Sequence, residues 1–107
     1  MPWTVGFLNA AVAREVGALP DDMRARLARL IRLIQEFGFR ALPHDAVKHL
    51  EGPLWELRVT GRDGISRAIY VTASGQRVVI VHAFVKKTQK TPRRELEIAR
   101  QRAKEVR

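Results

Sequence analysis

The sequence predicts an α+β domain in which an N-terminal strand and one or two helices precede a three-stranded antiparallel meander and a C-terminal helix. Residues 23–37 carry apolar side chains at helical spacing, whereas residues 54–60, 65–72 and 77–85 are rich in β-branched residues. The chain has 107 residues, of which 46% are hydrophobic, so we expect one core and a single domain over residues 1–107.

The N-terminal half is expected to contain a strand at residues 3–8 and a short helix at residues 10–18. Asp21 or Asp22 is well placed to cap the helix that follows, and Gly38 to end it. Its apolar face comprises Met23, Leu27, Leu30, Ile31, Ile34 and Phe37. Its arginines are interpreted as a solvated helix face; they are Arg24, Arg26, Arg29 and Arg32.

Turn residues separate the three later strands. Asp63-Gly64 and Ser74-Gly75 tolerate the positive φ angles of tight hairpins, which predicts antiparallel pairing. Residues 78–81 are apolar throughout, so the last strand is expected to be central and buried on both faces. The final helix is expected to start at Thr91-Pro92, with threonine as the cap and with the helices packed on one face of the sheet.

Strand alternation predicts which side chains share a face. Trp55 and Leu57 are expected in the core, which places Arg58 on the opposite face. For Arg67 and His82 the same test is ambiguous, because their face-mates are apolar.

The chain is strongly basic, with a net charge of +9 and a pI near 11.3. Most of the excess lies in residues 86–107, which contain nine Lys or Arg residues and three Glu residues. Such a balance favours a polyanionic partner: nucleic acid, an anionic membrane surface or an acidic protein. No run approaches the roughly 18 apolar residues that span a membrane, so we expect a soluble, cytoplasmic protein without a membrane partner.

Several classes of chemistry are excluded. The chain has no cysteine, so thiol catalysis and thiolate metal sites are impossible. His44 and His49, in an expected loop, and the distant His82 show no metal-ligand spacing. Neither a carboxylate pair of the two-metal type nor a glycine-rich phosphate loop is present. We therefore expect no metal and no cofactor.

A set of cations near the predicted sheet remains: Lys48, Arg58, Arg67, His82, Lys86, Lys87 and Lys90. Metal-free RNA cleavage needs little more, because the 2′-hydroxyl supplies the nucleophile and the protein moves protons and stabilises charge. Arginine suits the phosphate and histidine the proton transfer. Structural interpretations stay open as well: His82 as a semi-buried histidine, Arg67 as a surface or cross-strand residue, and the nearby Tyr70 as a core aromatic.

Together these residues resemble a known family. The pattern is Lys48-x-Leu50, Leu54-Trp55-Glu56-Leu57-Arg58, Arg67-x-x-Tyr70 and His82-x-Phe84-x-Lys86-Lys87-x-x-Lys90-Thr91-Pro92-x-x-Glu95. It is similar to the phage-derived branch of the RelE/ParE toxin superfamily, which includes HigB-like toxins of type II toxin-antitoxin systems. The resemblance covers roughly residues 46–103.

This resemblance implies a microbial-RNase-like fold, entry into the ribosomal A site, metal-independent cleavage of mRNA and neutralisation by a helix-turn-helix, HigA-like antitoxin. It implies catalytic roles for Arg58, Arg67, His82 and Lys87. It also implies RNA contacts from Lys48, Tyr70, Lys86, Lys90 and Arg93.

The C-terminal segment departs from the family pattern, because no aromatic residue or histidine follows Phe84. Two alternatives therefore stay open beside the nuclease: a non-catalytic toxin of the same fold that inhibits gyrase, as ParE-like relatives do, and a basic RNA-binding module. The tail from Lys86 could also serve only to dock an acidic antitoxin.

Overall fold

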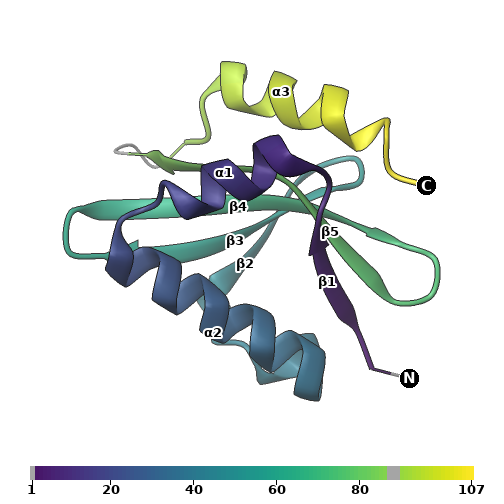
Figure 1. Cartoon of the computed structure of the whole chain (residues 1–107), viewed down its shortest axis with the longest axis horizontal. Helices are drawn as coiled ribbons and strands as arrows, with labels where there is room; N and C mark the ends of the chain where they lie inside the picture. Colours follow the sequence, from purple (N-terminus) through teal and green to yellow (C-terminus); the bar gives the residue numbers. More distant parts are fainter. Residues whose placement is uncertain (1, 87–89) are drawn as a thin grey trace.

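In the computed structural model, which describes residues 2–86 and 90–107, one sheet has the strand order β1-β5-β4-β3-β2 (Figure 1). Its strands are β1 (Thr4–Phe7), β2 (Val47–Glu51), β3 (Leu54–Gly61), β4 (Gly64–Ala73) and β5 (Arg77–Lys86). The helices include α1 (Ala10–Gly17), α2 (Asp21–Phe37), α3 (Arg93–Ala103) and the short 3₁₀ turns η1 (Phe39–Ala41) and η2 (His44–Ala46). The α+β class and the antiparallel β3-β4-β5 meander are confirmed.

Two strands extend the predicted meander into a wider sheet. β1 pairs in parallel with the first half of β5, and β2 pairs antiparallel with β3. The expectation that His49 lies in a loop is wrong, because it belongs to β2. Val47 and Leu50, the apolar residues of β2, are three apart and a register shift follows His49, so the segment lacks the alternation typical of a strand. Pairing with β3 makes it one.

Helices α1 and α2 cover one face of the sheet (Figure 1). Met23, Leu27 and Ile34 of α2 pack with Leu57 and Val59 of β3. Pro20 takes the N-cap position of α2, so neither Asp21 nor Asp22 is the cap. Instead, the Asp22 carboxylate accepts hydrogen bonds from the backbone N–H groups of Met23 and Arg62, which ties α2 to the β3–β4 turn.

Helix α3 lies on the opposite face, so the expectation that all helices share one face is wrong. Its residues Leu96, Ala99 and Ala103 pack against Leu54, Ile69, Val71 and Val81. The apolar run at residues 78–81 explains this, because Val78 and Ile80 face α1 and α2 while Val81 faces α3. β5 is interior as expected, although β4 is the middle strand. Pro92, not Thr91, takes the N-cap position of α3.

The expectation that Trp55 lies in the core is wrong. Trp55 points to the same face as Leu57, yet 38% of its surface stays exposed. Because α2 ends at Phe37, neighbours such as Trp3 and Phe39 cover this end of the face, and they line a pocket with Trp55. Among the described residues, no helix has the length and apolar character needed to cross a membrane.

Candidate functional site

Strand register gathers charged side chains on the sheet face that carries α3. Lys48 lies opposite Glu56, Arg58 opposite Arg67, and Lys86 opposite Ile65. Because α3 packs over Leu54, Ile69 and Val71, these charged residues occupy the other end of the face, toward the β3–β4 turn. We call Lys48, Glu56, Arg58, Arg67 and Lys86 the cationic cluster.

The floor of the cationic cluster is a buried ion pair. Nη1 of Arg67 donates to both carboxylate oxygens of Glu56, at 2.5 and 2.7 Å, and neither side chain is exposed. Charge-assisted hydrogen bonds of this kind fix both partners. The guanidinium of Arg67 therefore lies below the surface and does not open toward solvent, in contrast to its expected direct contact with a phosphate.

Lys86 is also buried, with 4% of its surface exposed. Desolvation, together with the nearby positive charges of Arg67, Lys48 and Arg58, lowers the pKa of its amine to about 8, against an opposing effect of Glu56. A lysine with a pKa near 8 exchanges protons readily at physiological pH. Lys86 is thus the residue of the cluster best suited to proton transfer.

The remaining members of the cluster are open to a ligand. Lys48 is exposed and Arg58 is half-buried. In the part of the chain that the structure describes, no hydrogen bond or ion pair engages the side chain of Arg58. Four cations, two of them buried, surround the single carboxylate of Glu56, and such a local excess of positive charge attracts an anion. The arrangement is suited to a phosphate group.

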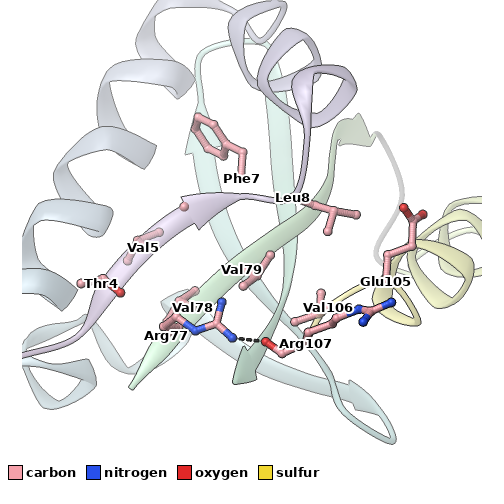
Figure 2. Close-up of a pocket in the computed structure, with 11 residues that line it drawn as sticks. Thr4, Val5, Phe7, Leu8, Arg77, Val78, Val79, Glu105, Val106 and Arg107 are labelled. Atoms are coloured by element: carbon pink, nitrogen blue, oxygen red, sulfur yellow. Dashed lines mark hydrogen bonds between the residues drawn. The ribbon is translucent and has the colours of Figure 1, made fainter. Parts of the chain in front are cut away.

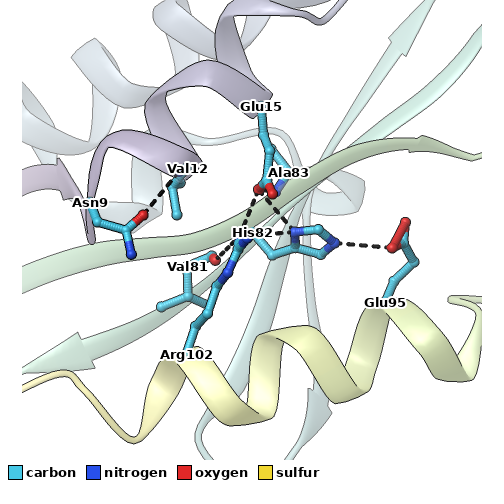
Figure 3. A network of polar contacts seen from close by, with 8 residues as sticks. All are labelled: Asn9, Val12, Glu15, Val81, His82, Ala83, Glu95 and Arg102. Atoms are coloured by element: carbon cyan, nitrogen blue, oxygen red, sulfur yellow. Dashed lines mark hydrogen bonds and ion pairs between the residues drawn. The ribbon is translucent and has the colours of Figure 1, made fainter.

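His82 shares this sheet face but is held by other residues (Figure 3). Its Nδ1 lies 2.9 Å from Oε1 of Glu15, and its Nε2 lies 3.1 Å from Oε1 of Glu95. Only 5% of its surface is exposed, and its ring stacks on Phe84. The imidazole thus lies between two carboxylates, of which Glu95 belongs to the first turn of α3.

The network around His82 closes the outer edge of β5, which extends past the end of β1. Glu15 Oε1 accepts from the backbone N–H of Ala83 at 3.2 Å, and Nη1 of Arg102 donates to Glu15 and to the carbonyl oxygen of Val81 (Figure 3). Burial raises the pKa of Glu15, but the hydrogen bonds from Arg102, Ala83 and His82 outweigh it and hold the pKa below its usual value. The network joins α1 and α3 to the sheet.

The other expected RNA contacts fall in different places. Tyr70 is 2% exposed and stacks on Phe39 on the opposite face, where burial raises its pKa to about 12. Lys90 and Arg93 are exposed at the start of α3. Lys87 lies outside the described residues. The structure thus brings Lys48, Arg58, Arg67 and Lys86 together, and it separates Tyr70 and the ring of His82 from them.

A pocket of about 470 Å³ lies between β1, the start of β5 and residues 105–107, where Arg77 donates to the carbonyl oxygen of Arg107 (Figure 2). It is at the opposite end of β5 from Lys86 and contains none of the expected site residues. Among the described residues, no three His, Asp or Glu side chains are grouped so as to hold a metal ion.

Sequence reasoning missed Glu56, Glu15 and Arg102. The position of Glu56 could have been predicted, since strand alternation places it on the same face as Arg58. Glu15 and Arg102 are 87 residues apart and meet only through the fold.

Comparisons with known proteins agree with this architecture. Residues 14–104 match the family model described as phage derived protein Gp49-like (DUF891). None of the curated proteins matches the chain. Among solved structures, a double mutant of the E. coli toxin RelE in the free state covers 100% of both chains, with a TM-score of 0.56 and 13% sequence identity. The chain therefore belongs to the phage-derived Gp49-like family, and it has the fold of RelE.

Proposed function

We propose that this protein is the toxin of a type II toxin-antitoxin pair, of the HigB-like kind, and that it cuts mRNA in the ribosomal A site without a metal ion. The observation that carries the proposal is the cationic cluster, which places four cations around one buried carboxylate on an open sheet face. The family and the RelE-like fold support it. A cytoplasmic site of action and a helix-turn-helix, HigA-like antitoxin belong to the same proposal.

In the proposed reaction the 2′-hydroxyl of the RNA attacks the adjacent phosphorus. The neutral amine of Lys86 accepts its proton, and the pKa of about 8 leaves about a tenth of the side chains neutral at pH 7. The bond from phosphorus to the 5′-oxygen breaks, and that oxygen leaves with a proton from an ammonium group of the cluster. The products are a 2′,3′-cyclic phosphate and a 5′-hydroxyl end.

Arg58 and Lys48 bind the reacting phosphate in this proposal, because they are the accessible cations of the cluster. Arginine presents two parallel N–H groups to phosphate oxygens, and the charge that develops in the transition state strengthens those bonds. Arg67 and Glu56 act as positioning residues: Arg67 contributes to the lowered pKa of Lys86, and Glu56 opposes it. Lys90 and Arg93 are proposed to hold neighbouring RNA phosphates, and Lys87, implied by the family resemblance, remains part of the proposal.

Induction in a bacterial host tests the function. We expect the wild-type protein to arrest growth and to leave new 5′ ends within translated codons, as mapped by primer extension. Arg58→Ala removes an accessible cation and leaves the Glu56–Arg67 pair in place, so it should abolish both effects while the protein stays folded. Arrest with intact transcripts would refute the nuclease.

A second candidate is a non-catalytic toxin of the same fold that inhibits gyrase. The engagement of His82 by Glu15 and Glu95 favours it, because both ring nitrogens of the histidine expected to transfer protons are held by carboxylates. Here arrest would come with DNA damage and uncut transcripts, and Arg58→Ala would leave the arrest unchanged.

A further inference from the structure

A second positively charged surface lies at the open edge of β3. β2 pairs with β3 only as far as Leu57, so residues 58–61 present their outer edge toward α2 and η2. A pocket of about 360 Å³ occupies this edge, and Arg26, Arg29, Asp45, Arg58 and Thr60 are among the residues that line it. We call it the three-arginine pocket.

One of the three arginines is anchored and two are available. Nη1 of Arg26 donates to the carbonyl oxygen of Thr60, which fixes α2 to the strand edge. Within residues 2–86 and 90–107, neither Arg29 nor Arg58 makes a hydrogen bond or an ion pair through its side chain. Arg29 lies three residues after Arg26, on the same face of α2. Arg29 can therefore bind a ligand in this pocket, next to Arg58 of the cationic cluster.

The charges in this pocket are unbalanced. Three guanidinium groups accompany one carboxylate, that of Asp45. Arginines on a merely solvated helix face can point apart into water, whereas these line a common concavity with a residue of the cationic cluster. The planar guanidinium presents paired N–H donors that match two oxygens of a phosphate. A phosphodiester, with one negative charge, fits both the excess charge and the donors.

We propose that the three-arginine pocket binds a backbone phosphate of an RNA strand, one that flanks the phosphate on the cationic cluster. Arg58 belongs to both surfaces, so the two binding positions are adjacent along the chain of the ligand. The identity of the cluster as the reaction site rests on the proposed function, but binding at the pocket does not. Either mRNA or ribosomal RNA can supply the phosphate.

Binding of an RNA that cannot be cut tests the pocket. A fluorescent 2′-O-methyl oligoribonucleotide lacks the nucleophilic hydroxyl, so its anisotropy reports binding alone. We expect Arg29→Ala to weaken binding about fivefold and to reduce the salt slope by about 0.7, the value for one contact on a single strand. Arg32→Ala, which removes the same charge from an exposed position of α2 outside the pocket, should change binding less than twofold.

A second arm uses ribosomes stripped of mRNA and measures co-sedimentation. Weaker binding of Arg29→Ala to the oligonucleotide alone would identify mRNA as the source of the phosphate, and weaker binding to ribosomes alone would identify ribosomal RNA. If Arg29→Ala equals Arg32→Ala in both arms, the proposal is overturned. If wild-type protein cuts no mRNA but Arg29→Ala still weakens either interaction, the proposed function fails and the pocket stands.

Discussion

Glu56 accepts two hydrogen bonds from Nη1 of Arg67, at 2.5 and 2.7 Å, and both side chains are fully buried between β3 and β4. The pair lies below the surface on which Lys48 and Arg58 remain accessible. A buried carboxylate beside several cations has two effects: it neutralises Arg67, and it limits how far the pKa of Lys86 falls. Glu56 therefore affects both the stability of the buried pair and the pKa of Lys86.

Removing the charge of Glu56 should destabilise the fold. Glu56→Gln removes the carboxylate charge that faces the buried guanidinium of Arg67, and losing one partner of such a pair costs about 3 to 5 kcal/mol. Urea unfolding at pH 7 measures this cost. Glu36→Gln, at an exposed position of α2, is the control and should change stability by less than about 0.5 kcal/mol. Equal stability of the two variants would show that the pair contributes nothing.

The rate of RNA cleavage should depend on the protonation of Lys86. Since the neutral amine is the proposed base, the single-turnover rate should rise about tenfold per pH unit below a pKa of about 8 and level off above it. Programmed ribosomes sampled between pH 6.5 and 9 give this profile.

Lys86→Arg is the matched variant for this profile, because it keeps the charge but cannot lose its proton near pH 8. It should reduce the rate about 10² to 10⁴-fold at the plateau. Retention of the wild-type profile by Lys86→Arg would assign the proton transfer to another group.

Lys86 should also make the fold less stable at neutral pH. Its folded pKa, about 8, lies below the ordinary value of 10.5, so the unfolded chain binds more protons and stability rises as the pH goes from 8 to 10.5. Lys86→Met should therefore stabilise the protein at pH 7, by about 1 to 3 kcal/mol. The comparison is Lys48→Met, whose side chain is exposed, with both followed by urea unfolding. A loss of stability in Lys86→Met would contradict the cost of burying this amine.

Glu15 should give a second pH dependence of stability, in the acid range. The pKa of Glu15 in the folded protein lies below the ordinary 4.5. Its stabilising contribution to the free energy of unfolding is therefore present above pH 4.5 and is lost as the pH falls through the folded pKa. Glu15→Gln should lower the free energy of unfolding by about 1 to 3 kcal/mol at pH 7 and by less at pH 3. Denaturant unfolding at the two pH values measures the difference. A deficit that is the same at both would mean that the carboxylate charge is not what stabilises the edge of β5.

Local sequence patterns predicted much of this fold. The apolar face from Met23 to Phe37 and the turns at Gly64 and Gly75 act over a few residues, and α2 and the β3-β4-β5 meander follow them. β2 had no such pattern, because its strand character comes from pairing with β3. Helix α3 was placed on the wrong face because a repeat along one helix does not specify which side of a sheet it covers.

The sequence indicated which cationic residues belong to the candidate site, but not how those residues contact one another in the fold. Alternation placed Arg58 on the face opposite Leu57, which the register bears out. The buried Arg67 pairs with Glu56, eleven residues away on another strand. The imidazole of His82 is hydrogen-bonded to Glu15, 67 residues away. Long-range partners of this kind leave no trace in local spacing, so the residues that hold a cation decide its role only in the folded protein.

Cleavage of mRNA on purified, programmed ribosomes tests the central claim most directly, because the chemistry leaves a diagnostic end. With wild-type protein, we expect a single cut at the A-site codon and a 2′,3′-cyclic phosphate on the upstream fragment. With Arg58→Ala the cut should disappear, and with Arg32→Ala it should persist. An intact message with wild-type protein, or equal cutting by Arg58→Ala, would contradict an RNase site built on the cationic cluster.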